Sequence, residues 1–266
     1  MPRAKGAVKG RMVSRGGAAS IVAVVGGEQM RFMVMHKVDA KMEAGEKPAQ
    51  GIVERMGKYV GESIEKGVFK DGAGLHGSAQ RVRMVFEGGK RVSVQKGPYE
   101  GRNELLAGFA MIQAWSIDEA VEKATKIGAA CGNAELEVGL VVEPWDIGIV
   151  AKPEDEMPKR YLVFRKADRA FEGGNDEVRL DGVYQQLGDE EPGSVISVGT
   201  LAPSKRGARL TKAERRWMDG PFAESKEMVA GYSIIEVAGL EEAKRWAEAY
   251  GDILVDNEVD VREVVG

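Results

Sequence analysis

The two histidines of this 266-residue chain are the side chains best suited to proton transfer near neutral pH. His36 follows the mostly apolar segment 31–35, and Asp39 stands three residues later, where a carboxylate would orient the imidazole and raise its basicity. His76 lies in the glycine-rich stretch 71–77, whose small residues allow a ligand to approach the backbone. The predicted catalytic residues are therefore His36, Asp39 and His76. The alternatives are a surface histidine for His36 and a simple strand end for His76.

Metal and nucleotide chemistry find little support in the sequence. Two histidines without a CxxC or HExxH pattern make a poor metal-binding set. The segment 72–77 resembles a dinucleotide loop only in part, because Ala73 interrupts the pattern and no βαβ unit surrounds it. The sequence predicts neither a bound metal nor a cofactor.

The segment 219–232 returns in altered form as 96–109, and the similarity continues to the end of the chain. Aligning 96–142 with 219–265 without gaps gives 14 identical residues in 47 positions. Unrelated sequences would share far fewer, so the chain is predicted to contain an internal duplication.

Both copies show the same order of predicted elements: strand, helix, strand, hairpin, strand, helix, strand. The segments are 31–35, 53–64, a strand reaching Leu75, the hairpin 81–94, 109–114, 117–127 and 136–142 in the first copy, and 160–164, 180–187, a strand reaching Leu201, a reduced hairpin, 232–237, 240–250 and 259–265 in the second. This order is the ferredoxin-like α+β plan, with helices on one face of an antiparallel sheet. The bare face needs a cover, so the two units are expected to pack sheet against sheet.

The duplication also sets the predicted domain boundaries. Residues 1–29 form a basic or disordered tail, 30–142 the first unit, 143–158 an acidic and proline-bearing linker, and 159–266 the second unit. Each unit is expected to have its own core. Gly128 and Gly251 follow the second helix of each unit at the same place and are predicted to end it.

Composition restricts the class of protein. With 43% hydrophobic and 30% charged residues and a formal net charge of −4, the chain reads as a soluble globular protein that does not bind nucleic acid. No apolar run is long enough for a membrane helix, and the segment 21–25 is too short for the core of a signal peptide. The single cysteine, Cys131, fits a reducing compartment, so a cytoplasmic location is predicted.

The segment 219–227, followed by Gly231-Tyr232, Trp246-Ala247 and the Asp260-Val-Arg triplet, closely resembles the signature of the YCII-related, or DGPF-domain, family. The first copy resembles it too, so two tandem copies are expected. The resemblance implies a dimeric α+β-barrel, here built within one chain, and a His and Asp pair in the cleft as its acid–base site. Relatives with this fold include lyases, isomerases, dehalogenases and monooxygenases, and DGPF members are associated with extracytoplasmic-function sigma factors.

The motif itself supplies further candidates for ligand binding or for structure. Asp219 is expected to cap the turn through its side chain, Gly220 and Pro221 to set the turn geometry, and Phe222 to pack inward. Three charged residues complete the set, namely Lys226, Glu227 and the counterpart of Glu227 in the first copy, Glu104.

The leading functional prediction is a protein that binds a small organic molecule in the barrel cleft. If it is an enzyme, a cofactor-independent lyase, isomerase or related acid–base enzyme is expected. The alternative is a non-catalytic regulatory or scaffold protein, for example a partner of a sigma factor. A monomeric pseudo-dimer or a homo-oligomer is the expected assembly, with a protein partner left open.

Overall fold

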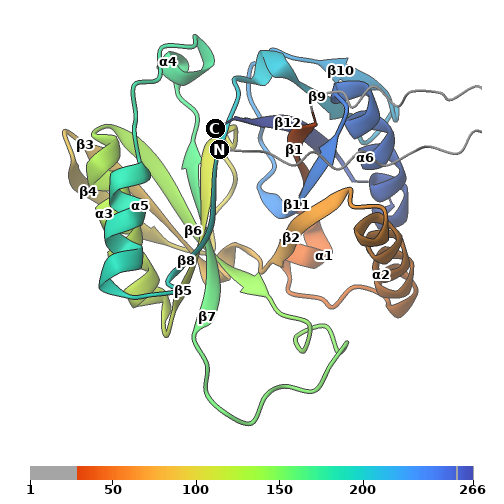
Figure 1. The fold of residues 1–266 in the computed structure, drawn as a ribbon, viewed down its shortest axis with the longest axis horizontal. Coiled ribbons are helices and arrows are strands. Elements are labelled where there is room, and N and C mark those ends of the chain that lie inside the picture. The colour runs from red at the N-terminus through yellow and green to blue at the C-terminus, as the bar shows by residue number, and fades with distance from the viewer. Residues whose placement is uncertain (1–28, 256, 266) are drawn as a thin grey trace, which may run out of the picture.

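Eight strands close into an antiparallel barrel in the computed structural model of the chain, which describes residues 29–255 and 257–265 (Figure 1). The strands follow one another around the barrel as β1 (Met30–Lys37), β11 (Val229–Val237), β2 (Phe69–Leu75), β6 (Ala134–Val142), β7 (Lys159–Lys166), β5 (Leu106–Ala114), β8 (Val195–Leu201) and β12 (Val259–Val265). β12 pairs again with β1 and closes the ring. The α+β class and the barrel expected from the sequence are confirmed. The predicted tail lies outside the described residues except for Gln29.

Two hairpin extensions continue the barrel sheet outward. β3 (Arg81–Glu87) pairs with β6 and with β4 (Lys90–Lys96), while β9 (Gly207–Leu210) pairs with β12 and with β10 (Trp217–Asp219). The first hairpin turns at Gly88 and Gly89, which have φ of 53° and 77°, a region that favours glycine. The second hairpin is shorter, as the sequence predicts.

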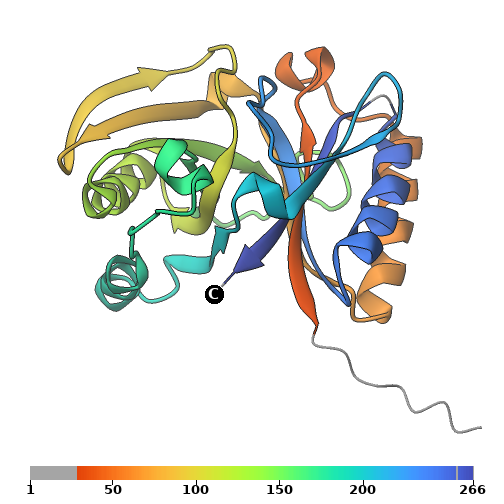
Figure 2. The same ribbon diagram turned by 90° about the horizontal axis from the view of Figure 1, so that it is seen from above.

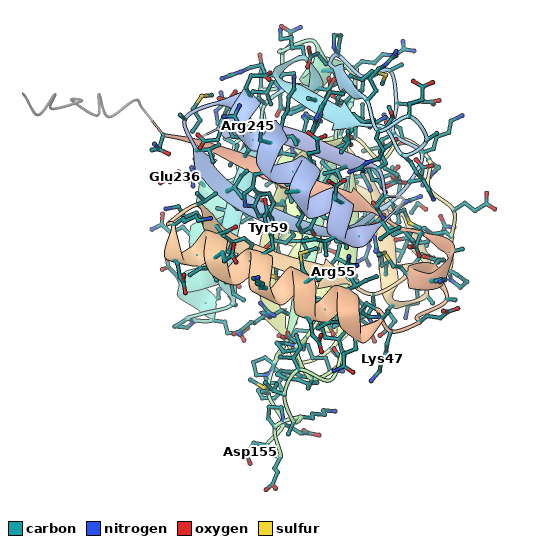
Figure 3. All side chains as sticks on the ribbon, turned by 90° about the vertical axis from the view of Figure 1, so that its right-hand side faces the viewer. Lys47, Arg55, Tyr59, Asp155, Glu236 and Arg245 are labelled. Atoms are coloured by element: carbon teal, nitrogen blue, oxygen red, sulfur yellow. The ribbon has the colours of Figure 1, made fainter. Side chains whose placement is uncertain are left out.

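Helices cover the barrel in two pairs, on opposite sides. α2 (Gln50–Glu65) and α6 (Leu240–Leu254) lie side by side over β12-β1-β11-β2, which we call the terminal sheet (Figure 3). α3 (Ile117–Cys131) and α5 (Asp181–Glu190) cover β6-β7-β5-β8, which we call the central sheet (Figure 2). Two short helices, α1 (Ala40–Glu43) and α4 (Arg169–Glu172), follow β1 and β7.

The two glycines predicted to end helices lie inside them instead. α3 continues from Gly128 to Cys131, and α6 continues from Gly251 to Leu254. A Cβ at position 128 would come within 2.3 Å of the Phe86 ring, and one at position 251 within 3.1 Å of Val259. Close packing of helix against sheet therefore explains these glycines better than a helix cap does.

The two sheets do not coincide with the two sequence repeats. The terminal sheet combines β1 and β2 of the first repeat with β11 and β12 of the second, and the central sheet combines β5 and β6 with β7 and β8. The expectation that each repeat builds its own sheet and core is thus corrected. Matching strands of the two repeats have similar residue patterns, so a strand could pair within its own repeat or with the other repeat. The connections between the strands decide which pairing forms.

The segment 143–158 has a different role from the one predicted. It connects β6 to β7, which are adjacent antiparallel strands with Leu136 opposite Arg165 and Leu140 opposite Tyr161. The acidic stretch is therefore the long loop of a hairpin within the central sheet, not a linker between two sheets. Figure 3 shows this loop extending away from the barrel, with Asp155 near its tip.

Apolar side chains fill three layers. One core lies between the central sheet and α3 with α5, and another between the terminal sheet and α2 with α6. The third is the barrel interior itself, which is occupied by buried residues that include Met33, Met111, Phe164 and Tyr232. Among the described residues, buried side chains thus occupy the barrel interior, where the ligand cleft was predicted.

Among the described residues, no helix combines the length and the apolar character needed to cross a membrane.

Candidate functional site

Charged side chains are buried where β7 ends, at one end of the central sheet. The Lys166 ammonium pairs with Glu104 and lies 3.3 Å from Glu137 Oε2. Arg83 Nη2 is 2.8 Å from Glu104 Oε1 and 3.0 Å from Glu137 Oε2, and Arg81 Nη1 is 3.0 Å from Glu137 Oε1. These five side chains form the central charge cluster, and each is at most 6% exposed. Because a buried charge is costly without partners, removing one carboxylate would leave buried cations uncompensated.

A matching terminal charge cluster lies where β1 ends. Lys37 Nζ is 2.8 Å from Asp260 Oδ2 and donates to Ser225 Oγ at 3.0 Å. Arg209 binds the same carboxylate through two nitrogens, Nε to Oδ1 at 2.6 Å and Nη2 to Oδ2 at 3.0 Å. In sequence, Lys37 and Asp260 correspond to Lys166 and Glu137 of the central charge cluster.

An arginine and a glycine exchange places between the two regions. Arg81 of β3 pairs with Gly139 of β6, whereas Gly207 of β9 pairs with Arg262 of β12. At each pair the arginine packs over the glycine: a Cβ on Gly207 would come within 2.7 Å of Arg262 Cδ. Each half therefore has a second arginine, which comes from the outer strand β3 in one half and from the barrel strand β12 in the other.

The buried carboxylates keep their charge because of the surrounding cations. Burial alone would raise the pKa of Glu137, but Lys166, Arg81 and Arg83 outweigh it and hold that pKa far below its usual value. Burial likewise opposes ionisation of Asp260, and Lys37 with Arg209 brings its pKa to about 2. Both carboxylates are therefore ionised at neutral pH.

The Gly-Pro turns hold an aromatic ring against one arginine in each cluster. Gly97-Pro98 and Gly220-Pro221 are both cis peptides, and a Cβ on Gly220 would lie 1.9 Å from the Ser204 carbonyl oxygen. The residue after each proline places its ring over a guanidinium. Arg83 Cζ lies 4.2 Å from the centre of the Tyr99 ring, and Arg209 Cζ lies 4.5 Å from the centre of the Phe222 ring. Phe222 is buried, as an inward-packing residue should be, while the role of Gly220 and Pro221 in setting the turn stays a prediction.

A serine and a glutamate fasten each turn. The Ser204 hydroxyl oxygen accepts from the Phe222 backbone N–H at 2.9 Å, and Glu172 accepts from the Ser204 N–H at 2.9 Å and from its hydroxyl at 2.5 Å. Ser78 and Glu43 repeat the arrangement in the other half. Asp219 does not cap the turn as predicted: its carboxylate binds Lys244 of α6 at 2.7 Å.

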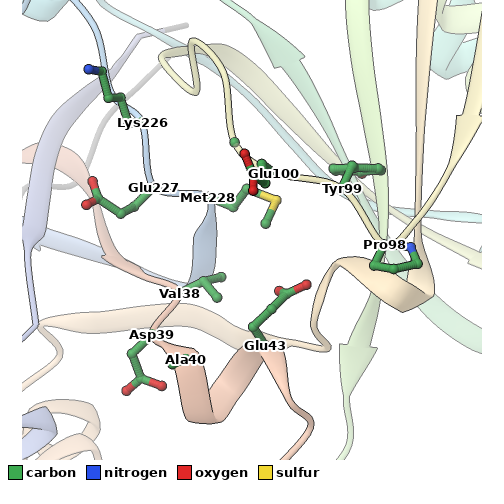
Figure 4. Close-up of a pocket in the computed structure, with 11 residues that line it drawn as sticks. Val38, Asp39, Ala40, Glu43, Pro98, Tyr99, Glu100, Lys226, Glu227 and Met228 are labelled. Carbon is green, nitrogen blue, oxygen red and sulfur yellow. The ribbon is translucent and has the colours of Figure 1, made fainter.

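An open pocket of about 450 Å³ lies between α1 and the two Gly-Pro loops (Figure 4). We call it the loop pocket; it is lined by Val38, Asp39, Ala40, Glu43, Pro98, Tyr99, Glu100, Gly101, Lys226, Glu227 and Met228. In the other half, Leu105, Ala107, Ala167, Phe171 and Phe222 form a buried apolar cluster. A smaller pocket of about 360 Å³ lies there, and its lining includes Asn103, Ala167 and Asp168, the counterparts of Lys226, Val38 and Asp39. Phe171 is 3% exposed, whereas Met42 at the matched position of α1 is half-buried. Both halves therefore carry a pocket at matched positions, and the two pockets differ in size and in lining.

The loop pocket carries more acidic than basic groups. Asp39 caps α1 by accepting from the Lys41 and Met42 N–H groups, and Glu43 is bonded to Ser78. Glu100 and Glu227 form no ion pair with any described residue. The Lys226 ammonium binds Glu224 at 3.3 Å, and Figure 4 shows it pointing away from Glu43 and Met228.

The predicted catalytic residues have three separate environments. The His36 ring is buried under α6, with Nδ1 2.8 Å from the Tyr250 hydroxyl. Burial lowers the pKa of His36 to about 4 although Asp39 acts to raise it, so the imidazole is neutral at pH 7. Asp39 is engaged as a helix cap, and no hydrogen bond joins it to His36.

His76 has a partner that the sequence did not suggest. Its Nε2 lies 3.4 Å from Asp146 Oδ2, in the hairpin loop after β6. Asp146 is itself held by the Glu143 backbone N–H at 2.9 Å. The structure thus places His76 beside Asp146, in a separate pocket of about 660 Å³ that Trp115 also lines.

The two matched glutamates have diverged in environment. Glu104 is 1% exposed and belongs to the central charge cluster, whereas Glu227 is exposed at the loop pocket. Beside Lys37, the Ser225 hydroxyl stands where the Glu104 carboxylate stands beside Lys166. The lysines and arginines of the clusters were missed as site residues, although the Lys and Asp that recur after β1 and β7 are visible in the sequence.

Comparison with known proteins adds a family for one part of the chain. Residues 199–265 match the YCII-related domain. An uncharacterized protein, R00369, of Rhizobium meliloti (strain 1021) is 41% identical over 59 residues, which are 21% of this chain and 48% of that protein. The chain thus spans about half the length of the curated relative it matches. No solved structure gives a significant match. The matched segment contains β9, β11, α6 and β12, and with them most of the terminal charge cluster.

Proposed function

We propose that the chain is a YCII-related protein that binds a small organic molecule in the loop pocket. The observation that carries this proposal is the lining of the loop pocket: apolar Val38 and Met228 and the carboxylates of Glu100 and Glu227 border an open space of about 450 Å³. An open pocket between loops is a natural place for a ligand. We also extend the YCII-related assignment to the first repeat, which shares the Gly-Pro turn and the charge cluster.

The lining of the pocket suggests the class of ligand. Val38, Tyr99 and Met228 provide apolar contact, whereas Glu100 and Glu227 provide negative charge that no ion pair with a described residue neutralises. A ligand with a positively charged amine and an apolar body would satisfy both. This proposal replaces the barrel cleft by the loop pocket as the place of binding.

The acid–base chemistry predicted for the histidines is not part of this proposal. The described lining of the loop pocket contains no histidine, and His36 is buried beneath α6 with its pKa lowered by burial. The proposed activity is therefore binding, with Glu100 and Glu227 as the residues that orient the amine.

Titration calorimetry with 2-phenylethylamine and its anionic counterpart 3-phenylpropanoate tests the proposal. We expect the amine to bind more tightly, and Ala40→Trp, which places a ring in the pocket, to weaken it by about tenfold or more. Ala44→Trp is the matched control because Ala44 lies on the same short segment, is exposed, and does not line the pocket. Equal binding by Ala40→Trp and the unaltered chain would refute the proposed site.

The charge of the pocket is tested separately. Glu227→Gln is expected to weaken amine binding several-fold, since it removes one unpaired carboxylate. Glu224→Gln is its control, because Glu224 is exposed and pairs with Lys226 but does not line the pocket. Tighter binding of the anionic probe would contradict the proposed ligand class but not the location.

A further inference from the structure

A second hollow, of about 530 Å³, lies on the outer face of β8, beside α5 and the loop that follows α4. We call it the β8 groove. It is lined by apolar side chains from three elements, among them Phe171, Leu180, Val198 and Leu201. A small inward extension reaches Phe109 and shares Arg165 and Tyr184 with the groove. The groove shares no lining residue with the loop pocket.

Arg165 is the buried charge of this groove. It stands where the first repeat has His36, and it is 9% exposed. Its two terminal nitrogens bind Asp176, Nη1 to Oδ1 at 3.1 Å and Nη2 to Oδ2 at 2.6 Å, while Phe171 packs 5.4 Å from the guanidinium carbon. Arg165 Nε is buried without a hydrogen-bond partner among the described residues. One donor of a rigid, buried guanidinium thus remains unused.

Further donors line the groove without acceptors. The hydroxyls of Tyr184 and Thr200 have no hydrogen bond to any described residue, and Arg179 uses only Nη1, on the Val178 carbonyl oxygen at 2.9 Å. Burial raises the pKa of Tyr184, so its phenol stays protonated and can donate. Asp176 already accepts from Arg165 with both oxygens. Donors therefore exceed acceptors on this wall.

The apolar floor of the groove is left open by the short helix above it. Val198 is 40% exposed although it lies in a barrel strand, because α5 has only 10 residues. On the terminal sheet the corresponding helix α2 has 16 residues, and Tyr59, Trp246 and Tyr250 fill the space between helices and strands. The groove thus combines an exposed apolar floor at Val198 with a buried donor that has no partner among the described residues, Arg165 Nε.

We propose that the β8 groove binds a small organic anion, a carboxylate with an apolar tail, with the tail on Val198 and Leu180 and the carboxylate near Arg179 and the Tyr184 hydroxyl. The donors favour a ligand that brings only acceptors, and the charge of Arg179 favours a negative one. Asp181, at the exposed start of α5, is the carboxylate such a ligand must avoid. The proposal is independent of the loop pocket, which is expected to select the opposite charge.

Calorimetric titration of the full chain with decanoate, decyltrimethylammonium and decanol tests this site. We expect decanoate to bind most tightly, and Val198→Trp, which fills the groove, to weaken it by about tenfold or more. Ile196→Trp is the matched control, because Ile196 lies on the same strand, is 47% exposed and does not line the groove. Ala40→Trp, in the loop pocket, should leave decanoate binding unchanged.

The charge is tested with Arg179→Ala, an exposed substitution that should leave folding intact. It is expected to weaken decanoate several-fold and to leave decanol unchanged. The proposal is overturned if Val198→Trp and Ile196→Trp affect decanoate equally, if no probe binds, or if decyltrimethylammonium binds as tightly as decanoate.

Discussion

The loop ends of the terminal and central sheets start from the same plan and finish differently. Both place a lysine between strands, an arginine under an aromatic ring and a carboxylate that joins them. Around this shared skeleton the pockets differ: the terminal half has the loop pocket with Glu100 and Glu227, whereas the pocket at the matched positions of the central half is smaller and is lined by Arg102, Arg165 and Lys166 among others. The buried charges and Gly-Pro turns are thus common to both halves, and the residues around them vary.

The halves also differ in how the chain builds them. The central charge cluster, its sheet and both covering helices come from one continuous stretch, residues 78–201, while the terminal sheet needs strands from both ends of the described chain. This difference gives the largest predicted effect. A fragment of residues 77–202 should fold and self-associate, since it keeps its outer core but exposes Phe109, Met111 and Phe164 of the barrel interior.

A fragment of residues 30–142 should instead fail to fold cooperatively, because β1 and β5 lose all their barrel partners. Circular dichroism during thermal unfolding and sedimentation velocity compare the two fragments. The prediction is wrong if the fragment 30–142 unfolds cooperatively as a dimer while the fragment 77–202 is unstructured, since the repeats would then be the folding units.

Removing the Phe171 ring should have the next largest effect. Phe171→Ala deletes a buried side chain from the apolar cluster of the central half and is expected to lower the free energy of unfolding by about 3 kcal/mol. Met42→Phe at the matched position should change it by less than about 1 kcal/mol, because Met42 is only half-buried. Urea unfolding of both variants checks this. Similar losses for the two would mean that the halves are packed alike.

The smallest predicted effect concerns the matched pair His36 and Arg165. Because the pKa of His36 falls to about 4 in the folded chain, against an ordinary value of 6.5, the unfolded chain binds more protons between these values. The stability that neutral His36 contributes is therefore present above about pH 6.5 and is lost as pH falls toward 4.

His36→Gln is the variant that isolates this contribution. The difference in unfolding free energy between the unaltered chain and the variant should shrink by about 1–2 kcal/mol from pH 7 to pH 5. Arg165→Gln changes the residue at the matched position and should show a difference that does not shrink in this way. Urea unfolding at the two pH values measures these differences. A difference for His36→Gln that stays constant would show that burial does not keep the His36 imidazole neutral.

Much of the fold could be predicted from residue patterns. The alternation of apolar residues marks the strands, the spacing of residues such as Ile117, Ala120 and Ala124 marks a helix, and Gly88-Gly89 marks a hairpin turn. These signals are local, so they survive without knowledge of the rest of the chain. These signals give a wrong prediction where contacts between distant residues determine the choice of residue. Gly128 is predicted to end a helix, but it is a glycine inside the helix that makes room for Phe86.

Residue patterns alone predict the duplication, the elements and the Gly-Pro turns, because repeated spacing and turn chemistry are properties of neighbouring residues. Contacts between distant parts of the chain establish that β1 pairs with β11 and β12, that His76 meets Asp146, and that Glu104 is buried while Glu227 is exposed. Two similar copies offer each strand two nearly equivalent partners, so pairing depends on connections and closure. The environment of a charge depends in turn on that pairing, and no local pattern encodes it.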